Sequence, residues 1–449
     1  MKKFIYLSVM LLTSVAFSSC DNEEDDIFDA SAAERLEQYK VQYSDILTSN
    51  GGKWLMEYFA NTGEQGYAFV MTFNADGSVR IAGNNKWIGG YKSEVSLWEM
   101  ISDNGPVLTF NSYNTVFHTF STPENIVGGP TSDIDGSDID ETGTGHAGDY
   151  EFMMMGATDE SGNTVRLKGK KRGYTILMHR LAADTDDEAL LAGYAAAPTK
   201  MFHEKIFPLY MTDETGERFV VTQSDGIFTF YPEAGDPVTQ TVSYNALISP
   251  DGIRFMNTIE IPRANDGVFT VQTFKLDDKQ QLVSTDASSR AEINAGSLSE
   301  LYVRKSYKWA VSTDEADCGE SMTALIASLK SDLKREVNQT FRSMSLYYDA
   351  QNETYALSVE TNRGTYNFYG EVVTVGDDTV RFVFPSEDGT VKGNSNAVKF
   401  FSRIPSFKTA LDMLNASDYK VSPESVLNPS VAQLVSTAGA AGFFTVKLK

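Results

Sequence analysis

The most specific arrangement of potential ligand residues in the sequence is an acidic segment in its first third. Asp138, Asp140 and Thr142 lie at alternate positions, Gly143 is the sixth residue of the run, and Asp149 is the twelfth. Calcium loops of the helix–loop–helix type use this spacing, because Ca²⁺ takes about six to eight oxygen ligands around a sharp turn. Asp138, Asp140, Thr142 and Asp149 are therefore candidate calcium ligands.

This segment also departs from a complete calcium loop. No helices are expected on either side of it, and the twelfth position holds Asp149 where Glu is usual. The stretch 122–148 is rich in Gly, Ser, Thr and Asp and has no apolar periodicity. Such segments are usually unstructured, so a solvated acidic loop is the favoured interpretation and calcium the alternative. No other cofactor is indicated.

Signatures of catalysis and of zinc binding are missing from the sequence. It contains no His-Glu-x-x-His, Cys-x-x-Cys or Gly-x-Ser-x-Gly pattern, and His118, His146, His179 and His203 are scattered. His118 and His179 lie in β-like runs and are expected to be structural. His146 could serve as a ligand, although exposure beside the acidic segment is the simpler expectation. No motif marks a catalytic carboxylate pair, so we expect a protein that is not an enzyme.

The tryptophans are candidates for platforms on which sugar rings stack. The sequence has four, Trp54, Trp87, Trp98 and Trp309. Trp54 and Trp98 lie in alternating segments and are expected in the core. Trp87 lies in the polar segment 84–90, so it is the candidate ligand-binding residue.

The N-terminal residues predict export and lipid attachment. Met1-Lys2-Lys3 is a short basic region, residues 4–17 are apolar but too few for a stop-transfer helix, and Ser18-Ser19-Cys20 follows. Cleavage is expected before Cys20, which is the expected lipidation site. The alternative is an ordinary secreted protein with a chance cysteine, but the cleavage site of such a protein normally ends in Ala-x-Ala.

The residues after Cys20 form the acidic run Asp21-Asn22-Glu23-Glu24-Asp25-Asp26. A cysteine followed by acids resembles the export signal of Bacteroidota surface lipoproteins. The resemblance implies that the protein is anchored in the outer membrane and faces the cell exterior. A plain solvated linker is the alternative.

The net charge restricts which binding partners are expected. The chain has 38 Lys and Arg against 61 Asp and Glu, a net charge of −23, and loss of Lys2 and Lys3 with the signal leaves 36 bases and a net charge of −25. Proteins bind nucleic acids and anionic lipids through clustered Lys and Arg side chains, so neither is an expected electrostatic partner.

The sequence has 2 cysteines, and only Cys318 remains beside Cys20, so no intramolecular disulfide is expected.

Apolar periodicity predicts a mainly β protein with a few packed amphipathic helices. Short segments alternate with period two and are separated by Asp-Gly turns, which indicates two antiparallel β domains, each a barrel or a sandwich. Gly52-Lys53-Trp54 resembles the start of lipocalin-like barrels, in which the Trp closes one end. Helices are expected from Asp29 to the stop at Asn50-Gly51-Gly52 and over residues 185–197, 321–337, 406–414 and 429–437.

The 449 residues are enough for two or three domains. The predicted organisation is a lipoprotein signal peptide over 1–19, an acidic tether over 20–28, an N-terminal helix with the first β domain over 29–181, a helical linker over 182–202, and a second β-rich domain with helices over 203–449.

Four segments resemble an uncharacterised family of Bacteroidota lipoproteins, a domain of unknown function. They are Gly52-Lys53-Trp54, Gly105-Pro106-Val107-Leu108-Thr109-Phe110-Asn111, His118-Thr119-Phe120 and Gly148-Asp149-Tyr150-Glu151-Phe152. The resemblance is expected to cover nearly the whole mature chain. It implies an association with Sus-type outer-membrane uptake systems and zinc-binding metallopeptidases, and it assigns no catalytic residues. Asp378-Thr379-Val380 also resembles a Bacteroidota O-glycosylation acceptor, which makes Thr379 a candidate modification site.

These observations together predict a surface-anchored lipoprotein that binds glycan, glycopeptide or peptide as an accessory of an outer-membrane nutrient-uptake complex. Two alternatives remain open: a hydrolase acting on such a polymer, and a structural subunit of the complex.

Overall fold

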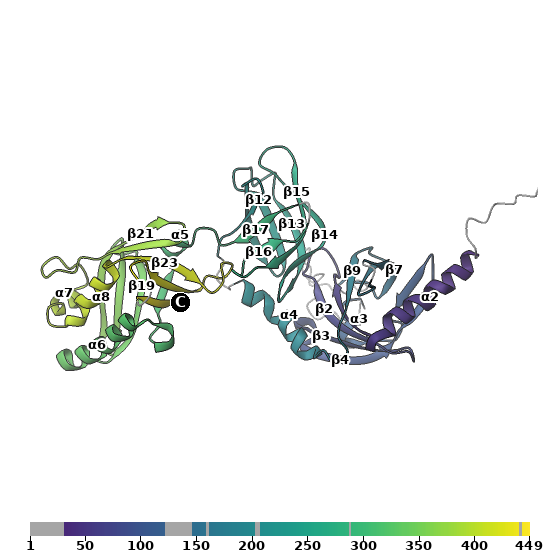
Figure 1. Cartoon of the computed structure of the whole chain (residues 1–449), viewed down its shortest axis with the longest axis horizontal. Helices are drawn as coiled ribbons and strands as arrows, with labels where there is room; N and C mark the ends of the chain where they lie inside the picture. The colour runs from purple at the N-terminus through teal and green to yellow at the C-terminus, as the bar shows by residue number, and fades with distance from the viewer. Residues whose placement is uncertain (1–30, 122–145, 159–160, 203–206, 287–288, 440–441) are drawn as a thin grey trace, which may run out of the picture.

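The computed structural model describes residues 31–121, 146–158, 161–202, 207–286, 289–439 and 442–449. Within these residues the protein is mainly β, as predicted. Its strands form three antiparallel units in chain order, a nine-stranded sheet and two closed eight-stranded barrels. The units lie in a row, with the N-terminal helix at one end and the third unit at the other (Figure 1).

The first unit is a sheet with two free edges, in the order β4-β3-β2-β1-β9-β8-β7-β6-β5. Its elements are α2 (Ala32–Thr48), η1 (Ser49–Gly51), β1 (Lys53–Tyr58), β2 (Tyr67–Phe73), β3 (Ser78–Asn85), η2 (Lys86–Ile88), β4 (Gly90–Leu97), β5 (Glu99–Ser102), β6 (Pro106–Thr109), α3 (Thr115–His118), β7 (Glu151–Ala157), β8 (Thr164–Gly169) and β9 (Thr175–Arg180).

This sheet differs from a lipocalin-like barrel because β4 does not pair with β5. A loop satisfies the backbone at the edge of β4: the Leu97 N–H donates to Ser112 Oγ at 2.8 Å, and Asn114 Nδ2 donates to the Glu94 carbonyl at 3.3 Å. Trp54 lies in the core of the first unit, as the sequence predicts. It is fully buried, and the Arg180 guanidinium lies 4.2 Å from its ring centre.

Helix α4 (Asp187–Met201) joins the first unit to the second. The helix predicted over 185–197 begins at Asp187, and Asp186 caps it by accepting the Ala189 N–H. The helix continues past the predicted end at residue 197, and Pro198 lies inside it. The second unit is a closed barrel of β10 (Leu209–Asp213), β11 (Arg218–Ser224), β12 (Ile227–Pro232), β13 (Val242–Ser249), β14 (Gly252–Pro262), β15 (Val268–Leu276), β16 (Leu282–Ser284) and β17 (Ala291–Asn294).

The third unit is a second closed barrel with helices packed around it. Its elements are α5 (Leu298–Tyr302), β18 (Lys308–Val311), η4 (Glu315–Asp317), α6 (Glu320–Val337), β19 (Phe341–Asp349), β20 (Thr354–Thr361), β21 (Gly364–Gly376), β22 (Thr379–Val383), α7 (Ser395–Phe400), α8 (Pro405–Asn415), β23 (Asp418–Pro423), β24 (Val431–Ser436) and β25 (Phe443–Leu448). The range 203–449, predicted as one β-rich domain, therefore contains two barrels.

The predicted helix over 429–437 is wrong, because these residues form β24. Ala432 and Leu434 are buried at alternate positions, and β24 pairs with both β23 and β25. Asn428-Pro429 is a typical helix start, with a cap followed by a first-turn proline, but period-two burial between two neighbouring strands outweighs this local signal. The helices predicted over 321–337 and 406–414 are confirmed as α6 and α8.

Each unit has its own hydrophobic core, and two side chains cross between the second and third units. Leu427, in the loop before β24, is buried in the core of the second unit, and Phe207 is buried in the core of the third. No helix in the described parts of the chain is both long and apolar enough to span a membrane.

Candidate functional site

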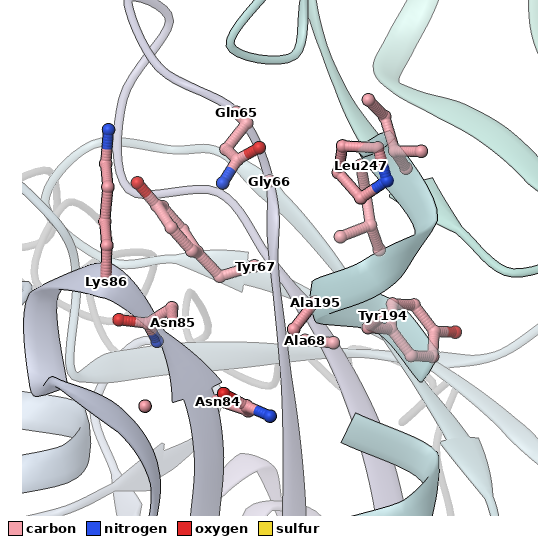
Figure 2. A pocket seen from close by; sticks show the side chains of 13 residues that line it. Gln65, Gly66, Tyr67, Ala68, Asn84, Asn85, Lys86, Tyr194, Ala195 and Leu247 are labelled. Carbon is pink, nitrogen blue, oxygen red and sulfur yellow. The ribbon is translucent and has the colours of Figure 1, made fainter. Parts of the chain in front are cut away.

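A cavity of about 340 Å³ lies between the first and the second unit. Its walls come from the start of β2, the end of β3, helix α4 and strand β13, so four segments distant in sequence meet there. Figure 2 shows Lys86, Tyr67 and Asn85 on one side of the cavity and Leu247 and Tyr194 on the other.

A tight turn after β3 sets the polar side of the cavity. Asn85 accepts the N–H groups of Trp87 and Ile88 and so caps the short helix η2. Gly89 and Gly90 then take φ values of 75° and 104°, a conformation that favours glycine. The turn leaves Lys86 exposed and Trp87 half-buried.

Hydrogen bonds to backbone groups join the two walls of the cavity. Asn245 of β13 donates through Nδ2 to the carbonyls of Asn61 at 2.9 Å and Glu64 at 3.1 Å. The Gly66 N–H donates to the Ala246 carbonyl at 3.0 Å. A Cβ at Gly66 would lie 2.7 Å from the Phe59 ring, so this close approach requires glycine. The segment 61–66 thus fixes the first unit against the second.

A buried polar network holds Tyr67 in place in the cavity wall. The Tyr67 hydroxyl donates to Glu64 Oε2 at 2.5 Å and accepts from Trp87 Nε1 at 2.7 Å. Asn61 Nδ2 donates to Glu64 Oε1 at 2.5 Å. Burial, followed by the nearby Glu64 carboxylate, raises the pKa of the Tyr67 hydroxyl. Tyr67 therefore acts as a fixed, neutral wall.

His146 belongs to the same network, which corrects the expectation that it is exposed. Its side chain is 0% exposed, and its ring lies 4.8 Å from Trp87 and 5.1 Å from Phe120, centre to centre. Nδ1 lies 3.1 Å from both Glu64 oxygens, whereas Nε2 has no hydrogen-bond partner among the described residues. The imidazole therefore donates its Nδ1 proton to Glu64, which compensates for its burial.

A second polar contact crosses the same interface. Arg254 of β14 contacts the Glu57 carboxylate of β1, and His179 Nε2 lies 3.6 Å from it. Burial alone would raise the pKa of Glu57, but Arg254 and His179 outweigh it and hold that pKa below the ordinary value. Glu57 is therefore charged near neutral pH.

The chemistry of the cavity lining favours binding of a neutral or anionic polar ligand. Three carboxamides, Gln65, Asn84 and Asn85, offer donors and acceptors, and Lys86 adds a positive charge. No Asp or Glu is among the described residues that line this cavity. In a chain with 61 acidic residues, this composition disfavours a cation as the ligand.

The remaining predicted site residues lie elsewhere. Asp149 is buried, and its two oxygens accept the Lys171 and Arg172 N–H groups, both at 2.9 Å. Cys20, Asp138, Asp140, Thr142 and His203 lie outside the described residues, so lipidation and calcium binding stay predictions. No group of three or more His, Cys, Asp or Glu suited to a metal occurs in the described ranges.

The candidate modification residue, Thr379, and the candidate ligand-binding residue, Trp87, both make side-chain hydrogen bonds. Thr379 is half-buried at the start of β22, and its hydroxyl donates to Asp378 Oδ1 at 2.9 Å. Trp87 supports Tyr67 through its indole N–H. The turn 84–90 contributes to the cavity lining, although Trp87 itself is not among the lining residues, and the sequence gave no local sign of Glu64, Tyr67 or Tyr194. His118 lies at the end of helix α3 and not in a β segment as expected, but both of its ring nitrogens bind backbone groups, which agrees with the expected structural role.

Comparison with known proteins assigns the family. A profile of a domain of unknown function, DUF4302, matches residues 24–277, which is more than half of the chain. The chain belongs to the DUF4302 family. The DUF4302 range contains every residue that lines the cavity, from Gln65 to Ile248, although it ends short of the expected coverage of nearly the whole mature chain. The family carries no assigned activity.

Other comparisons add nothing to the function of this DUF4302 protein. No curated protein matches it. The structure is similar to a DNA polymerase III β chain from Streptococcus pneumoniae TIGR4, with 9% identity, 92% of this chain and 97% of that chain covered, and a TM-score of 0.13. It is also similar to transferrin binding protein B from serogroup B Neisseria meningitidis, with 9% identity and a TM-score of 0.13. That match covers 88% of this chain and 76% of the other chain. Such low scores carry no functional argument.

Proposed function

We propose that this DUF4302 protein is a surface lipoprotein that binds a glycan, glycopeptide or peptide segment in the cavity between its first and second units. It does so as an accessory of an outer-membrane nutrient-uptake system. The observation that carries the proposal is the cavity itself, where three carboxamides, one ammonium group and two tyrosine rings converge on about 340 Å³. Binding sites for polar ligands combine such convergent groups with an apolar floor, here Leu247 and Ile248.

The fixed geometry of the walls supports binding in particular. Tyr67 is held by Glu64 and Trp87, and the segment 61–66 is tied to β13. A ligand would therefore find its partners already oriented, which reduces the entropy lost on binding. The described lining has no carboxylate that could act as an acid or a nucleophile, which favours binding over polymer hydrolysis at this site.

A binding experiment tests the proposal. The purified full-length lipoprotein in detergent is titrated calorimetrically with neutral oligosaccharides, acidic oligosaccharides and unstructured peptides, and the mixtures are then analysed for products. Ala195→Trp, which places a large ring in the cavity from α4, should abolish binding, and Lys86→Ala should weaken it. Lys92→Ala, an exposed lysine on β4 with no ion pair among the described residues, is the matched control.

Each outcome has a clear meaning. Binding that is lost in Ala195→Trp and kept in Lys92→Ala supports the proposal. Released products would indicate a hydrolase, and absence of binding to all three ligand classes would favour a structural subunit.

The proposed location is tested separately. Radiolabelled palmitate should be incorporated into the wild type and not into Cys20→Ala. Protease added to intact cells should digest the wild type, and full protection would contradict exposure at the cell surface. A pull-down from outer membranes should recover a transporter if the protein is an uptake accessory.

A further inference from the structure

A second cavity of about 340 Å³ lies between the second and third units, away from the cavity of the proposed function. Residues of β10, β11 and β17 form one side, and α5 with the turn between β21 and β22 forms the other. The cavity reaches Asp377 and therefore extends beyond the DUF4302 range.

Hydrogen bonds hold the walls of this second cavity together. The Ala295 N–H donates to the Val426 carbonyl at 3.0 Å, and the Ser299 N–H donates to the Asp377 carbonyl at 2.9 Å. Burial of Leu427 in the core of the second unit fixes the same junction. The lining groups are therefore held on a rigid frame.

The charges in the second cavity do not neutralise one another. Arg218 lies over the Tyr210 ring, 4.3 Å from its centre, and pairs with Glu233 at 3.2 Å, outside the lining. Arg304, Glu300 and Asp377 also line the cavity, and none of them has an ion-pair partner among the described residues. Both signs of charge are thus available to a ligand.

Neutral donors complete the site. Asn294 accepts the Gly296 N–H with Oδ1 at 2.9 Å, which leaves its two amide N–H groups for another partner. Thr212 adds a hydroxyl. These groups suit the carbonyl of a peptide bond.

We propose that the second cavity binds a zwitterionic ligand, a free amino acid or a short peptide with both termini uncapped. The guanidinium groups of Arg304 and Arg218 recognise the carboxylate, because their planar donors match its two oxygens. Glu300 and Asp377 recognise the ammonium group. The first cavity, which has no described carboxylate in its lining, lacks this pairing of charges.

Three related dipeptides test this proposal by calorimetry on the full-length protein. Dialanine should bind, whereas N-acetyl-dialanine, which lacks the ammonium group, and dialanine amide, which lacks the carboxylate, should each bind at least about tenfold more weakly. Absence of dialanine binding, or equal binding of the capped forms, would overturn the proposal.

Variants locate the ligand. Arg304→Gln and Glu300→Gln should each weaken dialanine binding about tenfold. Both side chains are exposed, so the fold should be kept, and Arg342→Gln, an exposed arginine away from the cavity, is the matched control. Ala195→Trp should leave dialanine binding unchanged. If Ala195→Trp removed it while Arg304→Gln did not, the dipeptide would lie in the first cavity, and only the second site would be refuted.

Discussion

At the scale of single residues, Glu64 is the centre of the buried network. Its carboxylate accepts hydrogen bonds from Tyr67, Asn61 and His146. These three side chains come from positions up to 82 residues away, yet each depends on the same pair of oxygens. The position of Tyr67 in the cavity wall therefore depends on a residue that does not itself line the cavity.

Replacement of Glu64 by Gln should destabilise the protein. One carboxylate oxygen becomes an NH₂ group, which faces another donor, so a buried polar group loses its partner at a cost of about 1–3 kcal/mol. Urea unfolding measures this difference. Glu371→Gln, an exposed residue of β21, should leave the free energy of unfolding nearly unchanged. Equal stability of Glu64→Gln and wild type would show that the network contributes little.

His118 should make stability depend on pH. Burial lowers the pKa of its imidazole, although the hydrogen bond to the Phe110 carbonyl opposes the shift. The unfolded chain then binds the proton more readily than the folded one, so stability is fully present above the unfolded value of about 6.5 and is lost as the pH falls below it.

The variant His118→Asn isolates this effect. Asn keeps an acceptor for the Asn114 N–H but does not titrate. When the pH is lowered from about 7.5 to about 5.5, the free energy of unfolding of His118→Asn should fall less than that of the wild type. Parallel pH profiles for the two proteins would contradict the assignment.

At the scale of secondary-structure elements, Asp149 fastens the hairpin between β8 and β9. Its oxygens accept the Lys171 and Arg172 N–H groups, and a Cβ at Gly169 would lie 2.2 Å from Oδ2. Burial raises the pKa of this carboxyl, although the hydrogen bonds from the two backbone N–H groups act in the opposite direction. An acid that the sequence suggested as a calcium ligand is therefore already engaged by the backbone.

Asp149→Ala should destabilise the protein by about 2 kcal/mol, because two amide groups lose their acceptor. The loss should be the same in calcium and in chelator, as measured by thermal unfolding. If chelator lowered the midpoint of the wild type and not that of Asp149→Ala, Asp149 would instead be a calcium ligand.

At the scale of the whole molecule, the ion pair of Glu57 and Arg254 links the first and second units. Both side chains are about one-tenth exposed, at 11% and 10%. Breaking a buried pair leaves a charge without a partner, which is more costly than removing both charges. This contact therefore couples the stability of two units whose cores are separate.

Arg254→Met should destabilise the protein by about 3–5 kcal/mol, and the double variant Glu57→Leu with Arg254→Met should recover part of that loss. Denaturant unfolding of the two single variants and the double variant measures the coupling. Arg381→Met, which breaks an exposed pair with Asp418, should have little effect. Additive losses in the double variant would show that the pair does not couple the units.

The sequence alone determined the local features. Period-two alternation and Asp-Gly turns predicted antiparallel β structure, helical spacing predicted α6, and Trp54 was correctly placed in the core. These features depend on residues a few positions apart, for which side-chain periodicity is sufficient. The lipidation signal at Cys20 is likewise local, and it stays a prediction.

Only the tertiary structure decided which sheets close into barrels and where the cavities lie. It closed two of the three sheets into barrels, made residues 431–436 a strand, and buried His146 against Glu64. The physical reason is the distance along the chain: Asn245 reaches Asn61 across 184 residues. Such contacts follow from sheet register and packing, which no local pattern contains. The cavity between the first two units exists only because those distant segments meet.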